Sequence, residues 1–306
     1  MLSTVISEDI ATLTPPSFST CLRIGDVGIS LHSSCGNALG LDDTLNIFRA
    51  HHDTSDIKAH VEWSDSLPPL RGEKVFDSGA IWTLFHDGDE LVFDFTSPVF
   101  GNSPYKRLRV DSSFRRAHIA LRRDVFRQHP SACPLEYPTD ELLFTNYLAF
   151  HGLGVEVHGC GLVDAKSGGH LFLGHSGAGK STTARLWNSR RHPEILSDDR
   201  IILRPHNGEL WMYGTPWHGE AVFASAAKAR LSRIFVLQHG KENHIMPLAK
   251  TRAVGELFAR CFPPFHSAVG LERTIEFLTR VVDTVPCHEF QFVPYESAIR
   301  TILSFR

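Results

Sequence analysis

The sequence predicts an α/β protein with α+β character: a mixed β-sheet core around a glycine-rich loop, preceded by a β-rich N-terminal module. The first observation is the run 171–187, where an apolar strand leads through closely spaced glycines into a helix. The second is an apolar strand over 161–163, separated from it by the turn residues Ser167-Gly168-Gly169. That hairpin connection favours a mixed sheet over a parallel, doubly wound one. The third is apolar alternation from residue 21 to about 125, which is typical of strands.

The N-terminal module is predicted to consist of strands joined by tight turns. Residues 1 to about 20 are polar, and we expect a loose arm that ends at Pro15-Pro16. Gly25-Asp26 has the chemistry of a type I′ turn and predicts a hairpin within residues 22–31. A second hairpin is expected around Asp87-Gly88. The remaining predicted elements are a short helix over 42–52 and strands over 61–63, 81–85, 91–95, 107–110 and 118–121.

A proline-rich junction predicts the division of the chain. Pro130, Pro134 and Pro138 precede a helix that Thr139 is expected to cap, with Asp140 and Glu141 in its first turn. Gly152 is expected to end this helix. Its predicted apolar face consists of Leu143, Tyr147 and Phe150. We therefore expect residues 1–130 to form the β-rich module and residues 131–306 to form the catalytic domain.

The second part of the chain alternates short strands with helices. A type I′ hairpin is predicted at Asn207-Gly208, and an unusual loop, GTPWHGE, follows over 214–220. A helix over 268–284 carries an apolar stripe of Leu271, Ile275, Leu278 and Val282. The other predicted elements are strands over 155–157, 194–197, 201–203, 210–213, 234–237 and 288–293, and helices over 249–260 and 295–303.

Composition excludes several classes of protein. Of 306 residues, 42% are hydrophobic and 21% charged, which suits a globular chain with a sizeable core. The net charge of −3 gives no basic field for a nucleic acid or an anionic membrane. Residues 1–17 lack the basic flank of a signal peptide, and no apolar run approaches the roughly 18 residues of a membrane helix. We therefore expect a cytoplasmic protein with no nucleic-acid or membrane partner.

The cysteines and histidines show no metal-binding spacing. The six cysteines are scattered without a C-x-x-C pair, and none of the 18 histidines pairs with another at a ligand spacing on one element. We therefore expect no structural metal.

The eight residues 174–181 fit the pattern G-x-x-x-x-G-K-[ST] at every fixed position. In such a loop the backbone N–H groups surround a phosphate, Lys180 reaches the outer phosphates and the Ser181 hydroxyl holds Mg²⁺. The following helix adds the positive end of its dipole. A chance glycine turn is the alternative, but the strand before and the helix after favour ATP and Mg²⁺. The expected nucleotide contacts are Gly174, His175, Ser176, Gly177, Ala178, Gly179, Lys180, Ser181 and Thr182.

Two further signals add chemistry to this loop. Asp198-Asp199 follows a short apolar run, so one carboxylate suits Mg²⁺ and the other could accept a proton from an attacking hydroxyl. A solvated acidic turn is the alternative for this pair. His158, one strand away from the loop, could contact phosphate or tune the carboxylate base. Taken alone, it would more readily be a core or turn residue.

Together, VHG at 157–159, GHSGAGKS at 174–181 and LSDDR at 196–200 resemble the catalytic half of bacterial HPr kinase/phosphorylase. The loop and the paired Asp are also similar to ATP-dependent phosphoenolpyruvate (PEP) carboxykinase, which shares the nucleotide-binding core. The resemblance covers roughly residues 140–300. A closer likeness is to HPr-kinase-like proteins of peptide natural-product cassettes, including lasso-peptide precursor kinases, through YPTDELL, LSDD and GTPWHG.

The resemblance implies a PEP-carboxykinase/HPr-kinase-like mixed sheet and assigns roles to residues. Lys180 would bind the β- and γ-phosphates, Ser181 and Asp198 would hold Mg²⁺, Asp199 would be the general base, and His158 would assist at the phosphate. The chain departs from HPr kinases at Thr182, where they have Glu, and at GTPWHGE, where they carry an Arg-containing phosphorylase loop. The resemblance also implies a homo-oligomer, since HPr kinases form hexamers.

The predicted function is transfer of the γ-phosphoryl group of ATP to a hydroxyl, with Ser or Thr of a peptide or small protein as acceptor. A kinase of a small hydroxylated metabolite is one alternative. A non-catalytic ATP-sensing adaptor is another, in which Asp199 has no role in turnover. In the GTPWHGE loop, either Pro216 and Trp217 anchor a tight turn on the core, or His218 or Glu220 faces the phosphates or a second metal, as a mobile lid would.

Overall fold

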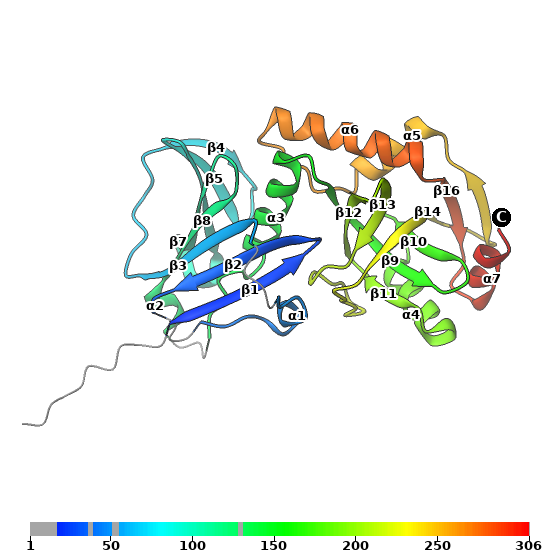
Figure 1. Ribbon diagram of the computed structural model, residues 1–306, viewed down its shortest axis with the longest axis horizontal. Coiled ribbons are helices and arrows are strands. Elements are labelled where there is room, and N and C mark those ends of the chain that lie inside the picture. Colours follow the sequence, from blue (N-terminus) through cyan, green and yellow to red (C-terminus); the bar gives the residue numbers. More distant parts are fainter. Residues whose placement is uncertain (1–16, 36–38, 51–54, 128–130, 306) are drawn as a thin grey trace, which may run out of the picture.

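The computed structural model describes residues 17–35, 39–50, 55–127 and 131–305, with the side chain of Asn102 excluded. The expected N-terminal arm therefore lies mostly outside the described residues. Two eight-stranded sheets lie side by side, with a helix between them (Figure 1). Within the described residues, no helix is both long enough and apolar enough to cross a membrane.

The first sheet contains strands β1 to β8 in the order β1-β2-β3-β8-β7-β6-β5-β4. Strand β3 pairs in parallel with β2 and β8, and the other pairs are antiparallel. The strands are β1 (Phe18–Ile24), β2 (Val27–Ser33), β3 (Ile57–Ser64), β4 (Glu73–Asp77), β5 (Trp82–Asp87), β6 (Glu90–Ser97), β7 (Gly101–Asp111) and β8 (Arg116–Arg122). The short helices are α1 (Asp43–Asn46), η1 (Pro98–Phe100) and α2 (Arg123–Phe126).

Both hairpins predicted in this module are confirmed. Gly25 and Asp26 have φ of 58° and 55°, the left-handed values that a type I′ turn needs between β1 and β2. Gly88, with φ of 64°, lies in the turn between β5 and β6. The helix expected over 42–52 is shorter, since α1 ends at Asn46 and residues 51–54 lie outside the described ranges. Strand β4 was not predicted.

Helix α3 (Thr139–Phe150) corrects two predictions. Thr139 is its first residue and not its cap, and the Thr139 hydroxyl is buried without a hydrogen-bond partner among the described residues. The expected one-sided apolar face is also wrong, because α3 is buried almost all round while Phe150 is 42% exposed. The helix ends as predicted: Gly152 has φ of 62°, and the N–H groups of Gly152 and Leu153 donate to Ala149 O and Leu148 O.

The second sheet follows the order β10-β9-β12-β13-β14-β16-β15, with β11 paired to β9 and a further pairing of β10 with β14. The β9–β10 pair is antiparallel, whereas β14 is parallel to both β10 and β16, so the predicted mixed sheet is confirmed. The strands are β9 (Val155–Asp164), β10 (Gly168–Leu173), β11 (Glu194–Ser197), β12 (Arg200–His206), β13 (Glu209–Tyr213), β14 (Lys228–His239), β15 (His244–Pro247) and β16 (Cys287–Phe292).

Helices cover both faces of this sheet. Along β10, Leu171 and Leu173 pack in one apolar cluster with helices α5 (Lys250–Phe258) and α6 (Ala268–Thr284). Phe172, between them, packs in another cluster with helices α4 (Lys180–Arg191) and α7 (Glu296–Ser304). Successive side chains of β10 thus enter apolar clusters on opposite faces of the sheet, which explains why the strand is apolar throughout.

The stripe predicted for α6 is only partly right. Leu278 and Val282 are buried, but Ile275 is 47% exposed. The buried face instead includes Thr274, Phe277 and Val281, so it is displaced around the helix.

The two sheets share a core and polar contacts. The first core cluster contains residues of the first sheet and of α3 together with Ile202, Tyr213 and Trp217 of the second part of the chain. The β1–β2 turn also reaches the second sheet, where Lys228 Nζ lies 2.6 Å from Asp26 Oδ2 and Arg204 donates to Gly25 O. These contacts hold the N-terminal module against the part of the chain that carries the predicted site.

Candidate functional site

The glycine-rich loop joins the end of β10 to the start of α4, as the sequence predicts. Gly177 and Gly179 have φ of 81° and 103°, which disfavour any side chain. A Cβ on Gly179 would lie 2.9 Å from the Phe292 ring, and one on Gly174 would lie 2.6 Å from the Ala178 Cβ. His175, Ser176 and Thr182 are exposed, whereas Ala178 is buried beneath the loop. The glycines thus allow a tight loop whose outer residues face solvent.

Lys180 lies folded against this loop at the start of α4. Its side chain donates to Gly174 O at 3.0 Å and to His175 O at 3.3 Å. Only 7% of Lys180 is exposed, and burial lowers the pKa of its ammonium while nearby Asp199 acts in the opposite direction. Within the described part of the chain, the hydrogen bonds of the Lys180 ammonium go to these two carbonyl oxygens. A buried ammonium held in this way suits an anionic ligand, because an anion would compensate its charge better than these dipoles do.

Ser181 and Asp198, the two residues predicted to hold Mg²⁺, lie in contact. Ser181 Oγ donates to Asp198 Oδ2 at 3.1 Å. The Asp198 carboxylate also accepts the backbone N–H groups of Gly219 and Phe223 on Oδ1 and of Ala221 on Oδ2, at 3.0 to 3.2 Å. A carboxylate has about four acceptor positions, so all of them are filled. Asp198 therefore fixes Ser181 and the segment 219–223 at the same time.

His158 and Asp199 form a second pair beside the first. Arg200 of β12 lies opposite His158 of β9 in the sheet, and Gly159 N donates to Asp199 O at 2.9 Å. This pairing places His158 Nε2 at 2.9 Å from Asp199 Oδ1, while Arg200 Nε donates to Asp199 Oδ2 at 2.8 Å. Burial raises the pKa of Asp199, but the contacts with His158 and Arg200 outweigh it and bring the pKa to about 2.

Arg200 is a site residue to which the sequence assigned no role. Its guanidinium donates to Glu141 of α3 and to Glu156 of β9, and it lies 3.8 Å from the centroid of the Phe262 ring. Burial raises the pKa of both glutamates, and the charge of Arg200 opposes this rise. For Arg200 itself, burial lowers the pKa, but the two glutamates act to raise it. Only its position next to Asp199 in LSDDR could have drawn attention to it.

The first turn of α3 contacts the site, in addition to placing acidic residues at the positive end of the helix dipole. Asp140 is 4% exposed, and its Oδ2 accepts Trp217 Nε1 at 2.6 Å. Burial raises the pKa of Asp140 to about 7, although the bond from Trp217 opposes the shift. Trp217 O in turn accepts the Ser197 hydroxyl at 2.8 Å. The expectation that Trp217 anchors the GTPWHGE loop is thus confirmed.

The lid alternative finds less support in the positions of His218 and Glu220. His218 Nδ1 lies 3.1 Å from Gly219 O, and Glu220 is exposed while its backbone O accepts Arg185 Nη2 at 3.0 Å. What the loop and the residues just after it bring to the site are the backbone N–H groups of Gly219, Ala221 and Phe223, which donate to Asp198.

A cavity of about 320 Å³ opens beside Asp199. It lies between the GTPWHGE loop, the start of α3 and the α1 region of the N-terminal module. Its lining residues are Asp42, Thr44, Leu45, Tyr137, Asp140, Asp199, Arg200, Pro216, Trp217 and His218. Both parts of the chain therefore form its walls.

Comparison with solved structures yields distant likenesses. No protein-family model matches the chain, and no curated protein matches it. Among solved structures, the chain is similar to the HPr(Ser) kinase/phosphatase from Coxiella burnetii, at 15% sequence identity and a TM-score of 0.29. The match covers 48% of this chain and 91% of the other. We therefore infer function from the residues of the site.

Proposed function

We propose that this protein is an ATP- and Mg²⁺-dependent kinase that transfers the γ-phosphoryl group to a Ser or Thr hydroxyl of a peptide or small protein. The observation that carries the proposal is the convergence of three separate segments. Ser181 of the glycine-rich loop contacts Asp198. The next residue in the chain, Asp199, contacts His158 of β9 and lines a cavity. Phosphoryl transfer needs a phosphate site, a metal and a positioned acceptor, and these segments carry residues suited to binding each of them.

The residues of the loop fit a nucleotide and its metal. Gly177 and Gly179 allow backbone N–H groups to surround phosphates, and Lys180 supplies the buried positive charge. Ser181 offers a hydroxyl oxygen as a ligand for Mg²⁺, and Asp198 behind it supplies negative charge. When bound, the ion would neutralise charge on the transferring phosphoryl group.

Asp199 fits the role of orienting the acceptor hydroxyl. A carboxylate with a pKa of about 2 is ionised at neutral pH but is a weak base. Phosphoryl transfer through a loose transition state needs positioning more than early removal of the proton. His158 and Arg200 hold Asp199 in place, so it can accept a hydrogen bond from the hydroxyl and take its proton late in the reaction.

The acceptor is proposed to enter the cavity beside Asp199. Its volume of about 320 Å³ suits one side chain and the backbone near it more than a folded protein surface. The α1 region, with Asp42, Thr44 and Leu45, would then help the N-terminal module to select the acceptor.

The test is transfer of label from γ-labelled ATP by the purified chain with Mg²⁺, against a library of Ser- and Thr-containing peptides and a set of hydroxylated metabolites. We expect a labelled peptide, and we expect loss of at least about a hundredfold in rate for Asp199→Asn, the lower end of general-base effects. Lys241→Ala, an exposed lysine outside the site, is the control and should retain full activity.

Binding measurements distinguish the alternatives. Lys180→Ala should lose ATP affinity, whereas Asp199→Asn should keep it, because Asp199 is proposed to act on the acceptor. Labelling of metabolites alone would favour a small-molecule kinase. Tight ATP binding with no transfer to any acceptor would favour an adaptor, and near-normal transfer by Asp199→Asn would contradict the mechanism.

A further inference from the structure

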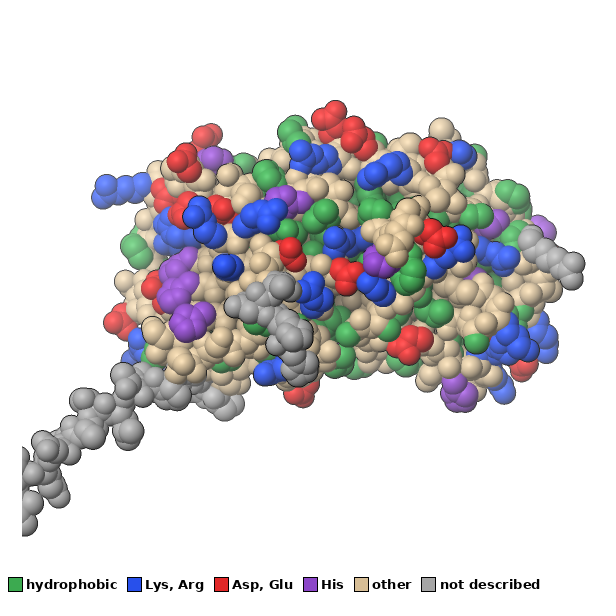
Figure 2. Space-filling model, in the orientation of Figure 1, with side chains coloured by type: hydrophobic (Ala, Val, Ile, Leu, Met, Phe, Trp, Pro, Cys, Tyr) green, Lys and Arg blue, Asp and Glu red, His purple; other side chains and the backbone are tan. Residues whose placement is uncertain are grey.

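The exposed face of the first sheet carries a group of histidines far along the chain from the predicted site. Strand β3 alternates strictly from Ile57 to Glu62, with Lys58, His60 and Glu62 on its exposed side. Figure 2 shows histidine side chains side by side over the N-terminal sheet. The sheet therefore presents imidazoles to solvent from more than one strand.

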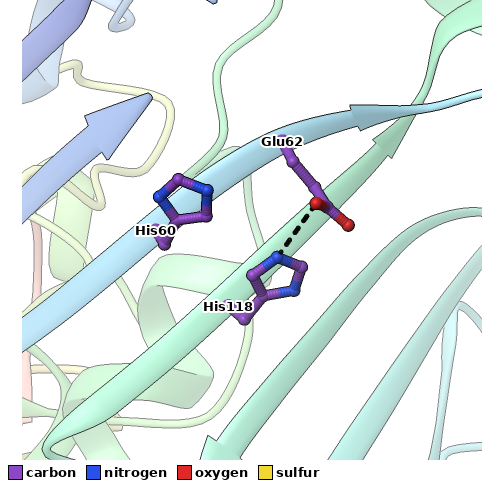
Figure 3. A group of neighbouring side chains, drawn as sticks. All are labelled: His60, Glu62 and His118. Atoms are coloured by element: carbon purple, nitrogen blue, oxygen red, sulfur yellow. Dashed lines mark ion pairs between the residues drawn. The ribbon is translucent and has the colours of Figure 1, made fainter. Parts of the chain in front are cut away.

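Strand register brings two of these histidines together. His60 of β3 and His118 of β8 are direct partners in a parallel pair, and their ring centroids lie 5.6 Å apart. Glu62, two residues after His60 on the same face, places its Oε2 at 3.4 Å from His118 Nε2 (Figure 3). One ligand atom from each of the three residues lies within 4.8 Å of the others.

The geometry points to a binding site for a divalent transition-metal ion of the Zn²⁺ class, held by His60, Glu62 and His118, and we propose this as a second site. Two imidazole nitrogens and one carboxylate oxygen are the donor set that Zn²⁺ accepts, at about 2.0–2.2 Å each. Tetrahedral ligands at that distance are about 3.4 Å apart, so the Glu62–His118 distance already fits and His60 needs only a small side-chain movement.

The surroundings suit a metal ion that keeps a coordination position open to solvent. His60 and Glu62 are exposed and His118 is half-buried, so solvent can fill a fourth position, as in sites with three protein ligands. Arg109, a basic residue on the neighbouring strand β7, lies opposite His118 but is bound to Asp87 and Glu90, each at 3.0 Å. Its charge is thus compensated. His32 of β2 lies one strand beyond His60, at 6.2 Å between ring centroids.

No sequence pattern indicated this site. His60 and His118 are 58 positions apart, and the expectation of no structural metal rested on spacings within single elements. The group forms because β3 and β8 pair in parallel, and a shift of one residue would turn His118 to the other face.

The test is titration of the full chain with Zn²⁺ by calorimetry, and with Co²⁺ followed by visible absorption. We expect one Zn²⁺ per chain, and a tetrahedral Co²⁺ spectrum without the charge-transfer band that the cysteine thiolates would give. The double variant His60→Ala/His118→Ala should lose at least about tenfold in affinity, as loss of partners at metal sites does. His86→Ala, an exposed histidine on β5 of the same sheet, is the matched control and should bind like the unchanged chain.

Each outcome decides the proposal. Unchanged Zn²⁺ affinity in a double variant with a native circular dichroism spectrum would overturn it, as would binding that shows thiolate charge transfer. If the double variant does not fold, the single Glu62→Gln variant replaces it, since this change only exchanges an exposed carboxylate oxygen for an amide. An anomalous scattering peak for zinc between His60 and His118 in crystals of the unchanged chain would support the site, and its absence at saturating Zn²⁺ would contradict it.

Discussion

The pKa values of two carboxylates of the site shift in opposite directions, although burial acts to raise both. Asp199 has two cationic or donor partners, so its pKa falls to about 2 and it stays charged. Asp140 is enclosed, with Trp217 Nε1 and Glu141 N as its donors, and its pKa rises to about 7. At the residue scale, burial dominates the pKa of Asp140, whereas the contacts with His158 and Arg200 outweigh burial at Asp199.

Replacing Asp140 by Asn is expected to change how stability depends on pH. Because the folded pKa of about 7 exceeds the ordinary 3.8, the stability from this group is fully present below pH 3.8 and is lost as pH rises toward 7. The difference amounts to about 4 kcal/mol. Urea unfolding of both proteins at several pH values should show Asp140→Asn gaining relative to the unchanged chain between pH 4 and 7. A difference that is constant over this range would contradict the raised pKa.

The segment 214–223 acts at the element scale, because it joins helix α3 to Asp198. Trp217 binds Asp140 of α3, and the N–H groups of Gly219, Ala221 and Phe223 bind Asp198. Trp217 thus fixes one end of the segment to α3, while the N–H groups that follow it contact Asp198 at the other end.

Trp217→Phe is therefore expected to lower both stability and phosphoryl transfer. It removes the hydrogen bond to Asp140 and leaves a buried carboxylate oxygen unpaired, which costs about 1–3 kcal/mol. Trp211→Phe is the matched control, because Trp211 Nε1 is buried and has no partner among the described residues. Denaturant unfolding and the transfer assay, applied to both variants, measure the effect. Equal behaviour of the two variants would show that the Asp140 bond does not position the loop.

Gly179→Ala tests the glycine-rich loop as an element. The alanine must adopt a left-handed φ and its Cβ must displace the Phe292 ring, so we expect ATP affinity to fall at least about tenfold. Gly208→Ala introduces similar strain, at φ of 80°, in a hairpin turn where nothing lies within 4 Å of the new Cβ. It should bind ATP normally. Calorimetric titration with ATP compares the two, and equal losses would mean that the loop geometry does not set affinity.

At the scale of the whole molecule, the two sheets are not independent bodies. Helix α3 packs into the core of the first sheet, and that core extends to Ile202, Tyr213 and Trp217. The cavity beside Asp199 has walls from both parts as well. A substitution of a buried residue in α3 should therefore destabilise both sheets together.

Phe144→Ala is the sharpest test of this shared core. Phe144 is fully buried, and its ring centroid lies 6.2 Å from that of Trp217. We expect a loss of about 3–5 kcal/mol in a single unfolding transition seen alike by circular dichroism and tryptophan fluorescence. Phe150→Ala on the same helix, where Phe150 is 42% exposed, should cost clearly less. Two separate transitions, with only one of them moved by Phe144→Ala, would contradict a common core.

Local features were predictable because local geometry decides them. The turns at Gly25-Asp26 and Asn207-Gly208 require left-handed φ angles, which these residues tolerate, and the structure has them. The loop 174–181 is likewise encoded by its own glycines. By contrast, the cap at Thr139 and the one-sided face of α3 were wrong, because tertiary packing encloses that helix.

The sequence by itself determined the glycine-rich loop, the hairpin that leads into it and the mixed sheet that follows from that hairpin. Only the tertiary structure decided the partners of the charged groups. Arg200 with Glu141, Asp140 with Trp217, and His60 with His118 are each separated by more than 50 residues and meet through strand register and helix packing. Hydrogen bonds and ion pairs act over a few ångströms, so their partners depend on the path of the whole chain and not on any local pattern.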